Sequence, residues 1–208
     1  GAFEGCSNLT KVTFAEGSQL KHIGDFAFAD CGKLAEIVLP NTVTSIGSGS
    51  FCNCDGLTEI IIPSGMIGDW AFANCYILGS VTIEDGVSSI GEGAFSCAYK
   101  LADLHISQSV YNIENGAFNY CNSLTDVYYS GSRPQWDAVT IGSYNDPLHN
   151  ATLHCSGSEQ DMPGDSTEND VIALFTYTIE NEEVIIHICD VAVSGELVIP
   201  DTIEGYPV

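Results

Sequence analysis

One unit of about 23 residues recurs six times in the first part of the chain. A leucine follows the central phenylalanine of each copy by six residues, and from the second copy on an isoleucine precedes it by five. Apolar positions fixed at a period of roughly 20–50 residues indicate a solenoid, in which each turn packs only on its neighbours. The phenylalanines are Phe3, Phe28, Phe51, Phe72, Phe95 and Phe118.

The typical copy reads I-G-x-x-A-F-x-x-C-x-x-L-x-x-I-x-I-P. Its second half ends with apolar residues at alternating positions, which is the period of a β-strand. The first half is too short for a stable helix, and we expect it to be extended and then to turn tightly. The predicted strands are parallel and cover residues 9–14, 34–39, 57–62, 78–83, 101–106 and 124–129.

Two further positions that recur in each copy, called columns here, predict features of the structure. Gly24, Gly47, Gly68 and Gly91 follow the isoleucine, and a glycine there predicts either a positive φ or close packing. A cysteine or alanine stands three residues after each phenylalanine, which favours a ladder of small buried thiols. Disulfides between adjacent rungs remain an alternative, because neighbouring strands about 4.8 Å apart lie within the usual Cα separation of a bridge.

The length of the repeat changes only between the strand and the next isoleucine, which indicates an exposed loop at one edge. The period stops after Tyr129. The segment from Ser132 to Val139 then predicts a short helix capped by Ser132, with Trp136 covering the end of the core. We expect a turn at 145–148 and a last strand at 151–155. Both ends of the chain are interpreted as cuts through a longer protein.

The sequence divides into three parts on composition. Residues 1–157 form the array with its C-terminal cap, and residues 158–170 are an acidic linker, in which a calcium loop around Asp161 and Asp165 is a minor alternative. Residues 171–208 contain strand-like alternation at 173–179 and 183–189, which predicts a β-hairpin and the start of a second array. Residues 158–208 hold 12 acidic and no basic residues, whereas residues 1–157 hold 16 acidic and all 5 basic residues.

The net charge of −23 repels phosphate backbones, so nucleic-acid binding is not expected. No apolar run approaches the ~18 residues that cross a bilayer, so no membrane-spanning segment is predicted.

The repeat unit resembles the BspA-like leucine-rich repeat family of bacterial surface proteins. Residues 128–152 are similar to the segment that closes such arrays, and residues 175–208 to the segment that opens them. The resemblance implies a secreted or surface-anchored protein, of a kind in which some relatives bind host matrix proteins or other cells. It implies no catalytic residues and no cofactor. The expected fold is a mostly β solenoid of the α/β type, a right-handed leucine-rich-repeat superhelix followed by a small β segment.

Candidate contact residues are those that flank the inward position of each strand, because alternate side chains share one face. We expect them on the concave face of the sheet, where a protein or glycan at a host or cell surface would bind. The predicted contact residues are Glu36, Val38, Glu59, Ile61, Thr82, Asp103, His105, Asp126 and Tyr128.

Three alternatives stay open at the level of the sequence. The array is an architectural spacer without a ligand, or its carboxylate pairs, such as Asp103 with Asp126, act on glycans or hold Ca²⁺. Paired carboxylates about 5–5.5 Å apart serve retaining glycosidases, but an open sheet offers no wall to desolvate either acid. His149, His154 and Cys155 near the cap are interpreted as structural residues, with a metal site as the alternative.

Overall fold

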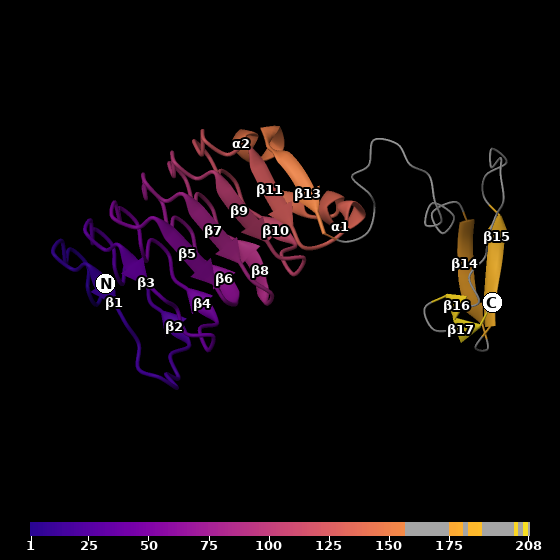
Figure 1. Cartoon of the computed structure of the whole chain (residues 1–208), viewed down its shortest axis with the longest axis horizontal. Helices are drawn as coiled ribbons and strands as arrows, with labels where there is room; N and C mark the ends of the chain where they lie inside the picture. The colour runs from indigo at the N-terminus through magenta and orange to yellow at the C-terminus, as the bar shows by residue number, and fades with distance from the viewer. Residues whose placement is uncertain (157–174, 181–182, 189–201, 204–205, 208) are drawn as a thin grey trace. The chain divides into compact units, whose positions relative to one another are not determined.

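The computed structural model describes residues 1–156 and four short strands between residues 175 and 207 (Figure 1). The chain forms two compact units, Gly1–Asp161 and Met162–Val208. The first unit is an array of stacked turns, in which every strand pairs in parallel with a strand of a neighbouring turn. This is the solenoid that the period of the sequence predicts.

One side of the array is the sheet that the repeat predicts. Its strands come from the second half of each copy, and the first two copies form a separate pair. The pair is β1 (Lys11–Val12) with β3 (Glu36–Ile37). The five-stranded sheet consists of β5 (Glu59–Ile62), β7 (Ser80–Ile83), β9 (Asp103–Ile106), β11 (Asp126–Tyr129) and β13 (Thr152–Cys155).

These strands are shorter than predicted, for a reason visible in their hydrogen bonds. The N–H of Leu34 donates to the carbonyl of Cys31, and Leu57 bonds in the same way to Cys54. Each leucine therefore closes a turn instead of opening the strand, and the sheet begins two residues later. The leucine side chain still points inward and is buried in the copies with a complete neighbour on both sides.

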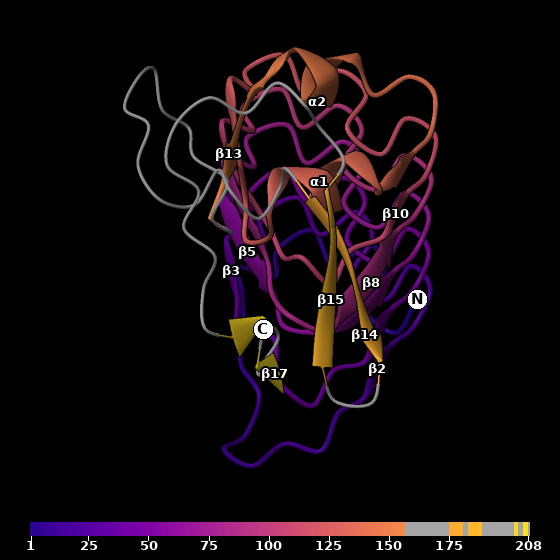
Figure 2. The same ribbon diagram turned by 90° about the vertical axis from the view of Figure 1, so that its right-hand side faces the viewer.

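The first half of the repeat contributes a second parallel sheet on the opposite side of the array (Figure 2). The prediction of an extended segment was correct here, but the sheet itself was not foreseen. Each strand ends at the conserved isoleucine, and tight turns follow. The strands are β2 (His22–Ile23), β4 (Ser45–Ile46), β6 (Gly65–Ile67), β8 (Val87–Ile90), β10 (Asn112–Ile113) and β12 (Thr140–Ile141).

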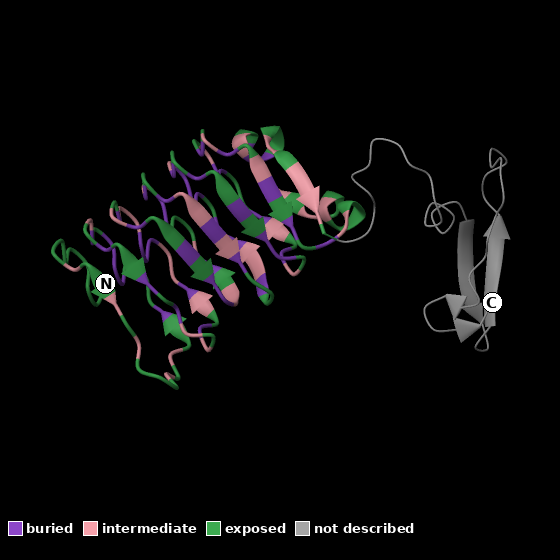
Figure 3. Ribbon diagram, viewed as in Figure 1, coloured by how far each residue is buried: buried purple, intermediate pink, exposed green. Residues whose placement is uncertain are grey.

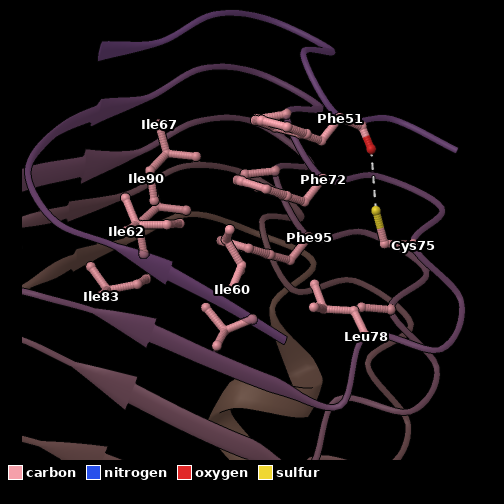
Figure 4. Close-up of a cluster of buried hydrophobic side chains, with 14 of the residues drawn as sticks. Phe51, Ile60, Ile62, Ile67, Phe72, Cys75, Leu78, Ile83, Ile90 and Phe95 are labelled. Atoms are coloured by element: carbon pink, nitrogen blue, oxygen red, sulfur yellow. Dashed lines mark hydrogen bonds between the residues drawn. The ribbon is translucent and has the colours of Figure 1, made fainter. Parts of the chain in front are cut away.

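The core lies between the two sheets, and burial alternates along β5, β7, β9 and β11 (Figure 3). The six phenylalanines form one continuous stack along the array, with ring centroids 5.1–5.3 Å apart and interplanar angles of 2–9°. Phe51, Phe72 and Phe95 are fully buried (Figure 4). Offset stacking of aromatic rings adds to the free energy gained by removing them from water.

The cysteine column is a ladder of thiols, as predicted. The Sγ atoms of Cys31, Cys54, Cys75 and Cys121 each donate to a phenylalanine carbonyl of the preceding copy, at 3.2–3.3 Å (Figure 4 shows Cys75). All the cysteines in the described residues are free thiols, so adjacent rungs are not bridged. Burial raises the pKa of Cys54 and of Cys121 to about 12.

The raised thiol pKa values predict a loss of stability at alkaline pH. The folded chain holds these protons more tightly than the unfolded chain, so the contribution is complete below pH 9.0 and is lost as the pH rises toward about 12. Each buried thiol should steepen the fall in unfolding free energy by up to about 1.4 kcal/mol per pH unit. Urea denaturation at several pH values measures this slope.

A matched control uses alanine, which occupies the same column as Ala98. The double variant Cys54→Ala/Cys121→Ala should lose less stability between neutral and alkaline pH than the parent chain. Identical slopes would show that other groups, such as tyrosines, govern alkaline unfolding.

From Gly47 on, the glycine column shows close packing, whereas a Cβ at Gly24 would meet no atom within 4 Å. The alternative of a positive φ is wrong at all four positions. A Cβ at Gly47 would lie 2.6 Å from the backbone nitrogen of Asp25, and one at Gly68 would lie 2.7 Å from the carbonyl carbon of Gly47. At these two positions the stacked turns approach too closely for any side chain. Positive φ angles occur instead two residues before and two residues after the phenylalanine, as at Gly49 (60°) and Asn53 (58°).

A cap of two short helices covers the last turn of the array. Ser132 begins α1 (Arg133–Asp137) with a capping box that includes Gln135, and Trp136 packs edge-on against Tyr129 with ring centroids 5.1 Å apart. Residues 145–148 were predicted as a turn, but they begin α2 (Asp146–Asn150), because Pro147 in its first turn favours a helix start. The last predicted strand is present as β13.

The second unit contains β14 (Phe175–Glu180) and β15 (Glu183–Ile188), which pair antiparallel as the predicted hairpin. It also contains β16 (Thr202–Ile203) and β17 (Tyr206–Pro207), a second antiparallel pair that was not predicted. The acidic linker at 158–170, with its alternative calcium loop, lies outside the described residues.

Candidate functional site

The candidate site is the exposed side of the five-stranded sheet, called here the sheet face. Two columns of side chains cross it in register. Glu59, Ser80, Asp103, Asp126 and Thr152 form the first column, and Ile61, Thr82, His105, Tyr128 and His154 form the second. Seven of the nine predicted contact residues therefore lie together in two rows on one surface.

The two remaining predicted residues, Glu36 and Val38, come from the preceding copy. Glu36 lies on β3, where its carboxylate accepts a hydrogen bond of 2.6 Å from the Lys11 ammonium. Val38 follows the end of β3 and is 71% exposed, and Ile61 on β5 is 56% exposed. Val38 therefore lies outside the five-stranded sheet, and Ile61 is an exposed apolar residue at the N-terminal end of the sheet face.

Three rings stack at the C-terminal side of the sheet face. The rings of His105, Tyr128 and His154 lie with centroids 4.8 Å apart at each step and interplanar angles of 15°. Because parallel strands repeat at this same spacing, the in-register positions bring the rings directly over one another. The side chain of Tyr128 is 40% exposed within the stack.

Two carboxylates fix the orientation of the imidazoles. Asp103 Oδ1 lies 2.9 Å from Nε2 of His105, and Asp126 Oδ1 lies 2.8 Å from Nε2 of His154. An ionised carboxylate only accepts hydrogen bonds, so in both histidines Nε2 carries a proton. The hydrogen bond from His154, followed by that from Thr125, lowers the pKa of Asp126. This carboxyl group is therefore ionised at neutral pH.

A shallow groove of about 450 Å³ runs beside the ring stack, where the strands end in loops. His105 and Tyr128 form one wall, and the hydroxyl of Ser107, hydrogen-bonded to Asp85, lies on the loop side. The groove combines aromatic edges with hydroxyl and carboxylate oxygens.

His154 is the member of the stack that the sequence analysis assigned to the cap. It belongs to β13, which continues the sheet in register with β11, so His154 takes the place after Tyr128. Its strand was predicted. The alternation of Thr152, Leu153 and His154 already indicated that the His154 side chain lies on the same face as that of Thr152. His149 lies on α2, and within residues 1–156 no three potential ligands gather to hold a metal ion.

The geometry defines a class of protein. Parallel strands, a leucine that closes every turn and a continuous phenylalanine stack make the chain a leucine-rich-repeat solenoid. The family model for the BspA type leucine rich repeat region matches residues 1–67 and 65–133, with six copies, and the chain belongs to this family. Members of the family are often bacterial surface proteins, and such repeats generally mediate protein binding.

Solved structures of bacterial leucine-rich repeat proteins are similar to this chain. A T. pallidum leucine-rich repeat protein is 32% identical with a TM-score of 0.57, over 68% of this chain and 64% of that one. The pneumococcal vaccine antigen PcpA is 26% identical with a TM-score of 0.48, over 74% and 36%. The chain thus spans less than two thirds of the length of either protein. No curated protein matches it.

Proposed function

We propose that this chain is a non-enzymatic scaffold, secreted or displayed on a bacterial surface, which recognises a protein partner through the sheet face. The observation that carries the proposal is the exposed ring stack of His105, Tyr128 and His154, held by two carboxylates. Tyrosine is enriched at the points of an interface that contribute most to binding. A ring already fixed by its neighbours also loses little conformational entropy when a partner binds.

The charge of the sheet face indicates the kind of partner. Glu59, Asp103 and Asp126 line one column of the face, and the array carries a net charge of −11. A basic protein surface would be attracted to this face, and complementary charge mainly raises the association rate and the specificity.

The area of the sheet face limits the affinity. Five strands at about 4.8 Å, with a sheet about 10 Å wide, give a strip of roughly 240 Å². A stable interface buries about 800 Å² on each partner. A single array should therefore bind weakly, and several arrays or the edge loops would contribute the rest. We propose that residues 171–208 begin a second array of this kind.

Two other functions are less well supported. A glycan-active enzyme would need one carboxyl group with a raised pKa, whereas the pKa of Asp126 is lowered and its surroundings are open. An architectural spacer would need neither a ring stack nor an exposed apolar residue on the sheet face, yet Ile61 is more than half exposed there. In the described residues no helix is long and apolar enough to cross a membrane.

A binding panel of host matrix proteins and mucins tests the proposal. We expect the double variant His105→Ser/Tyr128→Ser to weaken binding about tenfold or more, as truncation of aromatic contact residues commonly does. Surface plasmon resonance with immobilised chain measures the change. Tyr111→Ser is the matched control, because Tyr111 is 65% exposed and lies just before β10 of the opposite sheet.

Two results would contradict the proposal. A spacer would bind no member of the panel, and a partner held elsewhere would bind both variants equally well. Glycan hydrolysis that is lost on Asp103→Asn would instead support the enzyme.

A further inference from the structure

A second set of exposed aromatic side chains lies on the turns that join the two sheets, away from the sheet face. The chain has a positive φ two residues before the conserved phenylalanine. Glycine takes this conformation without cost, whereas for a bulky side chain it is strained. Aromatic residues and glycines nevertheless share this column, which reads Phe26, Gly49, Trp70, Gly93 and Gly116, and continues in the cap with Tyr144.

The aromatic rings of this column lie on the glycines of the next turn. A Cβ at Gly93 would meet Cε3 and Cζ3 of Trp70 at 2.5 Å and Cδ2 at 2.9 Å. Three consecutive ring atoms at nearly one distance mean that the face of the ring, and not its edge, covers the glycine. Phe26 covers Gly49 in the same way, with Cε1 at 2.5 Å and Cδ1 at 2.7 Å.

About half of the surface of each of these two residues remains exposed to solvent. Phe26 is 48% exposed and Trp70 is 49% exposed. The two residues are separated by two steps of the array, which corresponds to about 10 Å at the usual strand spacing. The intervening position is Gly49, so nothing rises between the rings. The column therefore presents two flat apolar platforms along one line.

A row of planar polar groups accompanies the platforms on the same turns. Nδ2 of Asn53 donates to Asp30 at 2.7 Å, and Nδ2 of Asn74 donates to Asn53 at 2.9 Å. These three residues occupy the second position of positive φ in successive copies, so their backbones are held in register. Their remaining donors and acceptors stand about one strand spacing apart.

We propose that this turn edge, defined by Phe26, Trp70 and the row Asp30, Asn53 and Asn74, binds an extended neutral glycan. The faces of Phe26 and Trp70 pack against the C–H faces of pyranose rings, whose weakly positive hydrogens meet the negative face of an aromatic ring. The amide and carboxylate groups accept and donate hydrogen bonds to sugar hydroxyls.

The spacing and the charge select the glycan. A β-1,4-linked chain turns over at every sugar, so equivalent faces recur once per disaccharide, which is about the separation of the two platforms. The acidic surface disfavours sialylated or uronate-containing chains, because like charges repel. The backbone strain at Phe26 and Trp70 is a cost that the glycine copies avoid, and such strain is concentrated at functional sites. The site is separate from the sheet face and does not depend on it.

Isothermal titration of the whole chain with cellohexaose, chitohexaose and maltohexaose tests the proposal. We expect binding of a β-linked oligosaccharide and none of the helical α-linked maltohexaose. Trp70→Gly should weaken binding about tenfold, in line with the loss of one stacking partner, and Phe26→Gly similarly. Glycine already occupies this column in three copies, so both variants should keep the melting temperature within a few degrees. Trp70→Phe should retain most of the affinity, and Tyr128→Ser should retain all of it.

Fluorescence gives a second readout that needs no unstable variant. In the Trp136→Phe chain Trp70 is the only tryptophan, and its emission should shift when the β-linked oligosaccharide is added. The proposal is overturned if neither of the two β-linked oligosaccharides changes this emission or produces heat. It is also overturned if both glycine variants bind as well as the parent chain. Loss of binding in Tyr128→Ser alone would place the glycan on the sheet face instead. The proposed protein recognition would still be tested separately by the binding panel.

Discussion

Phe72→Ala is expected to lower the free energy of unfolding by about 3–5 kcal/mol, which is the usual cost of removing a buried phenylalanine. Phe72 is fully buried, and its ring stacks on Phe51 at 5.1 Å and on Phe95 at 5.2 Å. The variant therefore loses two ring contacts and leaves a cavity that rigid turns cannot close. Urea denaturation followed by circular dichroism measures the change.

Phe3→Ala is the matched control for this variant. Phe3 belongs to the same stack, but it is 49% exposed and its ring stacks on one other ring, that of Phe28. Its removal should cost well under half as much, because a half-exposed ring gains much less free energy from burial than a fully buried one. Equal losses in the two variants would show that the stack does not act as a continuous core. A second unfolding transition in Phe72→Ala would show that the array has divided into independent halves.

The sequence predicted the array closely because its information is periodic. A residue type that recurs at Phe28, Phe51, Phe72 and Phe95 has the same environment in every turn. Once one copy is placed in the core, all the others follow. The second sheet was missed because each of its strands ends at a single conserved isoleucine, and two to four residues show no alternation. The strand limits were overestimated because the leucine is buried like a strand residue although its N–H closes a turn.

The candidate surfaces were predicted only in part, since exposed positions vary between copies. The columns of Asp103 and His105 followed from the alternation of side chains within a strand. His154 was missed because the cap interrupts the period before β13. Trp70 was missed because the alternation of aromatic residue and glycine has meaning only when the turns are stacked and one ring covers the next glycine.

Asn145→Ala is expected to cost about 3 kcal/mol, since it leaves a buried backbone N–H without a partner and removes further hydrogen bonds. In complete turns the phenylalanine N–H donates to a backbone carbonyl of the next copy, as Phe95 does to Ala117 at 2.7 Å. Within residues 1–156 no further copy follows Phe118, and Oδ1 of Asn145 takes the place of that carbonyl at 3.0 Å. Its Nδ2 donates to the carbonyls of Glu114 and Gly142.

Hydrogen exchange locates this effect within the array. In Asn145→Ala the amide of Phe118 should exchange faster by a larger factor than the amide of Phe72, because the last turn opens before the middle ones. Asn145→Asp keeps the acceptor but loses both donors and faces two carbonyl oxygens with a charge, so it should also be destabilised. Asn150→Ala, at an exposed position of α2, should change neither rate. If Phe118 and Phe72 respond equally to Asn145→Ala, the array unfolds as one unit and the side chain stabilises all turns together.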